Sequence, residues 1–167
     1  LSASANDDKI AWYESDGAAD PSFTARTIST SADGARSVYA ADIDNDGDMD
    51  VLSASTGDDK IAWYENDGAA DPSFTARTIS TSADNAQSVY AADIDNDGDF
   101  DCLATNHSST IKLLENDGTG HFTDITPGSG LEISGVFLPA KLDDFDNDGF
   151  VDLIYTGGDD GFFRNNG

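Results

Sequence analysis

Acidic side chains are concentrated in three nine-residue segments with the pattern D-x-D-x-D-G-x-x-D. These segments are residues 42–50, 93–101 and 144–152, named here the first, second and third acidic loops. Alternate carboxylates on a tight turn place several hard oxygen atoms around one point, and glycine at the sixth position permits the sharp bend. Ca²⁺ takes about six to eight oxygen ligands in a flexible arrangement, whereas Mg²⁺ needs stricter octahedral geometry. The pattern therefore predicts about three Ca²⁺ ions per chain.

Other interpretations of the loops fit less well. Zinc and copper favour His or Cys ligands, and the loops contain neither. An EF-hand or dockerin needs a Glu at position 12 between two helices, but Ser53, Ala104 and Tyr155 occupy that place and the flanking residues resemble strands. If the loops were only Asp-rich hairpin turns without a bound cation, the repulsion among four crowded carboxylates would cost several kcal/mol. Because all ligands come from one loop, we expect each ion to stabilise its own hairpin.

The chain is built from a repeat of 51 residues. Residues 1–51 and 52–102 differ at only seven positions, and a diverged third copy follows over residues 103–152. A partial fourth copy ends the chain, with Arg164 to Gly167 in the place of Glu115 to Gly118. The elements that position the loops must therefore recur with the same period.

Short strands are the expected elements of each repeat. In the second copy they are predicted over Ser37–Ile43, Asp50–Ser55, Lys60–Glu65 and Phe74–Thr81, bounded by turn-forming residues. Between the second and third copies, Ala62 becomes Lys112 while Ile61 and Trp63 remain apolar as Ile111 and Leu113. This alternation predicts one buried face and one face exposed to water. No stretch has helical periodicity, so helices should be nearly absent.

Four antiparallel strands per repeat of about 51 residues predict an all-β fold, a β-propeller with four-stranded blades. A stacked β-solenoid is the alternative. The metal-binding hairpin loops would lie between the first and second strands of each blade. The expected units are a partial blade over residues 1–31, full blades over 32–82 and 83–130, and a partial blade over 131–167. Fourteen strands in four blade positions follow from this division.

The acidic loop, the S-V-x-A-A-D-I-D approach to it and the I-A-W-Y-E-N-D-G strand together resemble the FG-GAP/VCBS repeat family. The resemblance covers nearly all 167 residues and implies a calcium-binding propeller like that of integrin α chains. It also implies that Ca²⁺ is held by side chains at loop positions 1, 3, 5 and 9 and by the carbonyl at position 7. The implied ligands are Asp42, Asp44, Asp46, Asp48 and Asp50; Asp93, Asp95, Asp97, Asp99 and Asp101; and Asp144, Asp146, Asp148, Phe150 and Asp152.

The F-G and G-A-P signatures of integrin blades are not evident, so the chain is more similar to the repeats of secreted bacterial proteins. The resemblance implies a scaffold or an extracellular binding or adhesion module. A lectin-like propeller, or the propeller part of a secreted lyase or dehydratase, is the alternative. No Ser/His/Asp or Cys/His arrangement surrounds His107 or His121, so we expect no enzymatic activity.

Several further residues have a simple structural interpretation. Trp12 and Trp63 are replaced by Leu113 and Phe162 in later copies, which favours core packing over sugar stacking. Tyr13 and Tyr64 should lie on the other face and are better binding candidates. The remaining singled-out residues are Cys102, interpreted as a small buried hydrophobe, Asn106-His107-Ser108, a chance glycosylation match, and the Glu-Asn-Asp-Gly segments, interpreted as turns.

Charge limits the partners of the chain. The net charge of −25 repels phosphate backbones and anionic lipids, so nucleic acid and membrane surfaces are not expected partners, and no apolar run is long enough to span a bilayer. Modest calcium affinity suits millimolar extracellular Ca²⁺, which predicts a secreted or cell-surface location. Two chains would supply eight blade positions, so self-association into a ring is expected; in the alternative, the chain is a piece of a longer protein.

Overall fold

A computed structural model describes residues 1–107, 110–133, 140–155 and 161–167. Within these ranges the chain is all β, with fourteen strands in four antiparallel sheets and no helix. The first sheet contains β1 (Ser2–Ser4), β2 (Lys9–Ser15) and β3 (Phe23–Ser29). The second contains β4 (Ala35–Ala41), β5 (Asp50–Ser55), β6 (Lys60–Asn66) and β7 (Phe74–Ser80). The third contains β8 (Ala86–Ala92), β9 (Asp101–Asn106), β10 (Lys112–Asn116) and β11 (Phe122–Asp124), and the fourth contains β12 (Ala140–Asp143), β13 (Asp152–Tyr155) and β14 (Gly161–Phe163).

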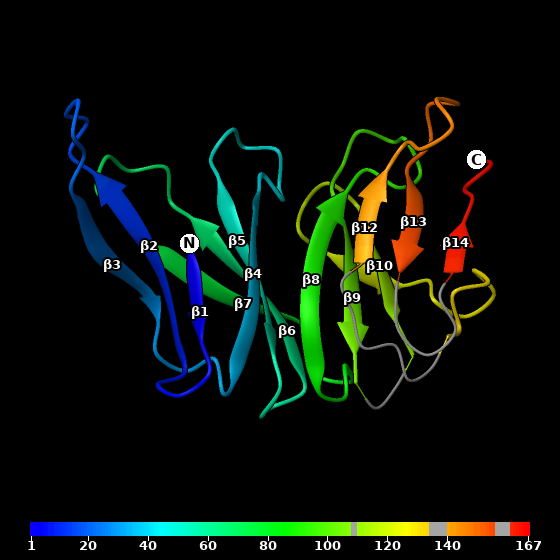
Figure 1. Cartoon of the computed structure of the whole chain (residues 1–167), viewed down its shortest axis with the longest axis horizontal. Helices are drawn as coiled ribbons and strands as arrows, with labels where there is room; N and C mark the ends of the chain where they lie inside the picture. The colour runs from blue at the N-terminus through cyan, green and yellow to red at the C-terminus, as the bar shows by residue number, and fades with distance from the viewer. Residues whose placement is uncertain (108–109, 134–139, 156–160) are drawn as a thin grey trace.

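The sheets stand side by side in chain order, from β3 at one end of the molecule to β14 at the other (Figure 1). Within each sheet, neighbours in sequence are neighbours in space, as expected for short hairpin connections. The described strands form four separate sheets and no closed barrel. The predicted unit boundaries at residues 31, 82 and 130 stay a prediction.

The first strand of the second copy differs from the prediction. It runs over Ala35–Ala41 and not over Ser37–Ile43, and its register with β5 shifts between Ala35 and Ser37. Ile43 cannot continue the strand because its backbone N–H donates to the Oδ2 atom of Asp50 within the acidic loop. The other three predicted strands of this copy agree with the structure to within one residue.

The prediction of one buried and one exposed face is wrong for the central sheets. All six residues of β5 and all six of β9 are buried, on both faces. The reason is that each central sheet lies between two neighbours, and an apolar cluster fills every gap between sheets. Burying a Leu, Ile or Val side chain contributes about 1.5–3 kcal/mol. The sheets therefore stabilise one another, and an isolated repeat would expose two apolar faces.

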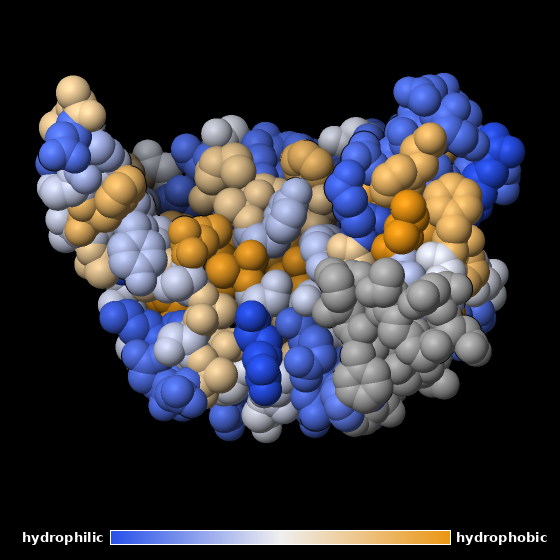
Figure 2. Space-filling view, in the orientation of Figure 1, coloured by the Kyte–Doolittle hydropathy of each residue, from blue (hydrophilic) through white to orange (hydrophobic). Residues whose placement is uncertain are grey.

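Small and aromatic side chains line the edge formed by the first strands. β4 and β8 lie against each other, and Tyr39, Tyr90 and Ala140 lie around a shared hollow there. The space-filling view shows apolar side chains across the middle of this side of the molecule, with hydrophilic ones below them (Figure 2). The acidic loops follow directly from the ends of these first strands.

Candidate metal centre

Each acidic loop connects the first and second strands of its sheet: β4 to β5, β8 to β9, and β12 to β13. Two residues in each loop have left-handed backbone conformations, namely the Asn at position 4 and the Gly at position 6. Their φ values are 58° and 95° in the first loop, 63° and 99° in the second, and 60° and 95° in the third. Asn tolerates this region and Gly adopts it freely, so the sequence D-N-D-G coils the chain tightly at this point.

Backbone N–H groups hold the carboxylates in place. The glycine N–H at position 6 donates to the Oδ2 atom of the position-1 Asp, at 3.0 Å for Gly47–Asp42 and 3.2 Å for Gly98–Asp93. The position-7 N–H donates to the position-5 carboxylate, at 2.9 Å for Asp48–Asp46. These bonds close Asx-type turns and fix the side chains before any ligand arrives. A metal site with fixed ligands loses little conformational entropy on binding.

The position-9 Asp is the buried centre of each loop. Asp50, Asp101 and Asp152 are at most 2% exposed. One oxygen of Asp50 accepts from the N–H of Ile43 at 3.0 Å, and the other accepts from the N–H of Asn66 at 2.8 Å. The same two bonds recur at Asp101 and Asp152. This carboxylate therefore ties the loop to the end of the third strand of its own sheet.

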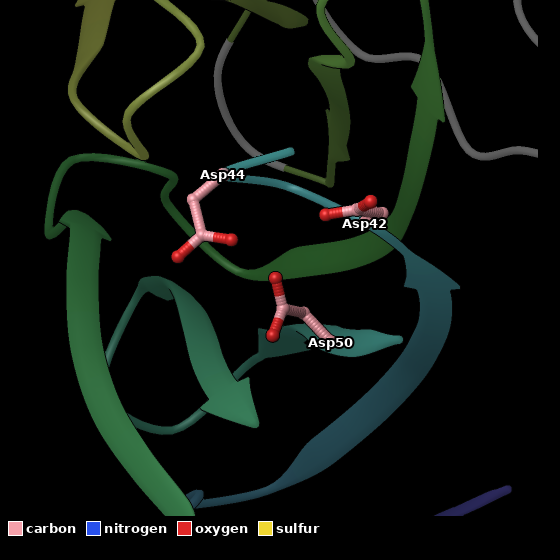
Figure 3. Close-up of side chains that lie close together, drawn as sticks. All are labelled: Asp42, Asp44 and Asp50. Carbon is pink, nitrogen blue, oxygen red and sulfur yellow. The ribbon is translucent and has the colours of Figure 1, made fainter. Parts of the chain in front are cut away.

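The loops bring carboxylates together. Oxygen atoms of Asp42, Asp44 and Asp50 lie within 4.8 Å of one another and face a common point (Figure 3). The equivalent group of the third loop contains Asp144, Asp146 and Asp152, whereas the group of the second loop contains Asp93, Asp95 and Asp97, at positions 1, 3 and 5. The predicted ligands outside these groups are Asp46, Asp48, Asp99, Asp101, Asp148 and Phe150. The ligand role of the position-7 carbonyls stays a prediction.

Burial and mutual repulsion make these carboxylates costly to ionise. Burial raises the pKa of Asp101 to about 6, and the charges of Asp95 and Asp97 contribute to the increase. Burial also raises the pKa of Asp50. Burial and the charge of Asp46 raise the pKa of Asp44. A cation at the common point would reverse these shifts, because an opposite charge nearby favours the ionised form.

Two buried oxygen atoms indicate whether the loops are suited to a metal ion. The Oδ1 atoms of Asp42 and Asp93 are buried and accept no hydrogen bond within the described structure. Each belongs to a position-1 Asp whose other oxygen is held by the glycine N–H. A buried, unpaired carboxylate oxygen costs at least about 1–3 kcal/mol. Hard oxygens left free in this way match the ligands of Ca²⁺, so the residues present fit the predicted ion.

Within the described part of the chain, the third acidic loop is the one that pairs with an arginine. The guanidinium of Arg164 forms ion pairs with Asp146 and Asp148, the latter at 3.2 Å. Arg164 occupies the place of Glu65 and Glu115 in the preceding copies. The third loop is thus partly neutralised by the protein itself.

Asparagine side chains link neighbouring sheets, a role that the sequence did not predict. The Nδ2 group of Asn116 donates to the carbonyl of Ile43 in the preceding loop at 2.8 Å, and Asn165 does the same to Ile94 at 2.7 Å. Asn96 reaches forward to the carbonyl of Gly149 at 2.9 Å. The Asn of Glu-Asn-Asp-Gly is therefore more than a turn residue. The one available signal was its recurrence in three copies, including Arg164-Asn165.

The other singled-out residues lie largely in the core. Trp63 and Tyr64 are both buried, on opposite faces of β6, so the expectation that Tyr64 faces a ligand is wrong. Its face is covered by the first sheet. Cys102 is fully buried, and burial raises the pKa of its thiol. His121 is exposed and lies 3.8 Å from the carboxylate of Asp117. Asn106 is buried, while Ser108 of the same sequon lies outside the described residues.

Comparison with known proteins supports the repeat assignment. The FG-GAP-like repeat pattern matches three times, over residues 1–53, 44–104 and 94–155. Neither the curated proteins nor the solved structures gave a match. Within the described residues, no helix has the length and apolar character needed to cross a bilayer. The three matches run in series over most of the chain, and the chain belongs to the FG-GAP-like repeat family.

Proposed function

We propose that the protein is a calcium-binding repeat module whose three acidic loops each hold one Ca²⁺ ion. The observation that carries the proposal is the buried, unpaired Oδ1 atom of Asp42, repeated at Asp93, in a loop whose other carboxylates face the same point. Side chains at positions 1, 3, 5 and 9 would supply ligands, with the position-7 carbonyl. The bound ion would neutralise the negative charge of the crowded carboxylates.

The ions have a structural role in this proposal. Each loop joins two strands, and its position-9 Asp is bonded to the third strand of the same sheet. An ion bound there fixes three of the strands of a sheet relative to one another. Since all proposed ligands belong to one loop, no coordination position is reserved for a substrate. We therefore propose a non-catalytic role.

The four sheets are proposed to be successive blades of a β-propeller. Support comes from the strands lying in chain order within every sheet, from the apolar clusters between the sheets and from the side-by-side arrangement in Figure 1. A module of this kind would serve as a scaffold or an extracellular binding module, in surroundings where Ca²⁺ is millimolar. Burial of Trp63 and Tyr64 removes the aromatic platform that a lectin function would use in the second sheet.

Calcium titration of the metal-free protein, by calorimetry and by competition with a chelating dye, tests the proposal. We expect about three sites, with weaker binding of Mg²⁺. Asp42→Asn should remove one site and leave the other two. Asp71→Asn is the matched control, because it removes the same charge from an exposed turn outside the loops. Absence of calcium binding, or equal loss of sites in both variants, would refute the proposal.

A further inference from the structure

The three acidic loops lie at the same end of successive sheets (Figure 1). Hydrogen bonds also join each loop to the next. Asn45, at position 4 of the first loop, donates its side-chain N–H to the Oδ1 atom of Asp99, at position 7 of the second loop. Asn96, at position 4 of the second loop, donates to the carbonyl of Gly149 in the third. Because position 4 lies between two proposed ligands, each proposed metal centre extends a side chain into the next one.

A second set of bonds between the loops passes through the asparagines at the ends of the third strands. Asn116, the last residue of β10, is 1% exposed. Its backbone N–H donates to Asp101, at position 9 of the second loop, at 2.9 Å, and its Nδ2 group donates to the carbonyl of Ile43 in the first loop at 2.8 Å. The N–H of Ile43 in turn donates to Asp50, at position 9 of the first loop, at 3.0 Å. One buried asparagine therefore connects the position-9 carboxylates of two loops.

The same connection recurs between the second and third loops. The backbone N–H of Asn165 donates to Asp152 at 2.9 Å, and its Nδ2 group donates to the carbonyl of Ile94 at 2.7 Å. The N–H of Ile94 donates to Asp101 at 3.0 Å. Asp101 therefore belongs to both connections. An unbroken series of hydrogen bonds runs from Asp50 through Asp101 to Asp152, one position-9 carboxylate in each loop.

We propose that the three calcium sites are coupled in series, so that an ion in one loop strengthens binding in the neighbouring loop. The inference rests on the proposed calcium binding. Without a cation, repulsion among the carboxylates favours local opening of a loop. Opening of the first loop breaks its bonds with Asn116 and Asp99, which removes part of the support of the second loop. An ion in the first loop prevents this, so a larger fraction of second loops is ready to bind.

Electrostatics alone would couple the sites in the opposite sense. A Ca²⁺ ion in one loop makes the surroundings of the next loop less negative, which weakens the binding of a second cation. Salt screens this effect, with a Debye length of about 10 Å at 0.1 M and about 3 Å at 1 M, whereas the hydrogen bonds remain. Positive coupling that persists at high salt would therefore have its origin in the hydrogen bonds between the loops.

NMR titration with Ca²⁺ at high salt tests the proposal, with one glycine amide as the reporter for each loop. Gly47, Gly98 and Gly149 each donate to the position-1 carboxylate of their own loop. Asp42→Asn should remove the first site and raise the dissociation constant of the second about fivefold or more, with a smaller change at the third. Coupling between binding sites is reciprocal, so Asp93→Asn should raise the dissociation constant of the first site by the same factor.

A second pair of variants tests whether the asparagines carry the coupling. Asn45→Gly combined with Asn116→Ala removes both side-chain bonds between the first and second loops, and glycine retains the left-handed backbone of position 4. In this background, Asp42→Asn should leave the dissociation constant of the second site unchanged. Asn66→Ala is the matched control, because its side chain donates to Met49 in the acidic loop of its own sheet. In the control background, the effect of Asp42→Asn should persist.

The possible failures of the two proposals are distinct. If the wild-type chain binds three ions but Asp42→Asn leaves the second site unchanged or makes it tighter, the coupling is overturned and the proposed function stands. A full effect of Asp42→Asn after both bonds are cut would overturn the role of the asparagines. Absence of calcium binding would overturn both proposals. Asn45→Gly alone changes an exposed residue and should reduce the coupling in part, so the test does not depend on the folding of the double variant.

Discussion

The first and third acidic loops have the same backbone conformation but differ in the charged side chains around them. Both have a left-handed Asn and Gly, and both bind the position-1 Asp through the glycine N–H at 3.0 Å. Beside the first loop lies Glu65, whose charge helps to raise the pKa of Asp44 and which itself pairs with Arg77. Beside the third loop, Arg164 pairs with Asp146 and Asp148. Local sequence therefore sets the loop geometry, while residues 65 and 164, from elsewhere in the sheet, set the charge that surrounds the loop.

Removing calcium should produce the largest difference in behaviour between the first and third loops. At a hundredfold excess of ion over the dissociation constant, each site contributes about 2.7 kcal/mol to stability. A chelator should therefore lower the melting temperature, and backbone amides of residues 42–50 should exchange hydrogen faster. Amides of residues 144–152 should change less because Arg164 stays in place. Hydrogen exchange with and without chelator measures this, and equal changes in both loops would contradict the comparison.

Reversing the charge at Arg164 should convert the third loop to the state of the first. Arg164→Glu removes a cation from Asp146 and Asp148 and places an anion there, which should tighten Ca²⁺ binding at this site about tenfold or more at low salt. Arg164→Gln is the intermediate control and should have a smaller effect. Calcium titration of each variant gives the answer. Unchanged affinity at low salt would show that the ion pairs do not compete with the cation.

The asparagine side-chain bond should contribute more to stability where it joins two different sheets. Asn116→Ala removes a buried amide and leaves the carbonyl of Ile43 without its donor, which should cost about 1–3 kcal/mol of unfolding free energy. Asn66→Ala is the matched control, because Asn66 makes the same backbone bond to Asp50 but its side chain donates only to Met49, in the acidic loop of its own sheet. Denaturant unfolding of both variants should show the larger loss in Asn116→Ala. A larger loss in Asn66→Ala would contradict the link between sheets.

Backbone substitution should affect both loops equally and is the smallest expected effect. Gly47→Ala and Gly149→Ala each place a Cβ on a residue with φ of 95°, which should cost about 1 kcal/mol in either loop. Nothing lies within 4 Å of the added atom at either position, so strain in the backbone is the main term. Thermal unfolding in chelator compares the two. If the costs differ clearly, the loops differ in backbone as well as in charge.

The sequence by itself determined the repeat, the fourteen strands, the position of each acidic loop and the family. These features depend on interactions among residues close in the chain. D-N-D-G coils because Asn and Gly accept left-handed backbone, and β5 begins at Asp50 because the coil ends there. A period of 51 residues then repeats the same local solution.

Only the tertiary structure decided which faces are buried and which side chains join separate repeats. Tyr13 and Tyr64 have nearly identical local sequence, yet one is exposed and the other is core, because a sheet covers the second and none covers the first. Asn116 reaches Ile43 across 73 residues, and the charge around the third loop depends on Arg164, which follows β14. Burial and electrostatics sum over neighbours in space, so the order of residues within one repeat could not specify them.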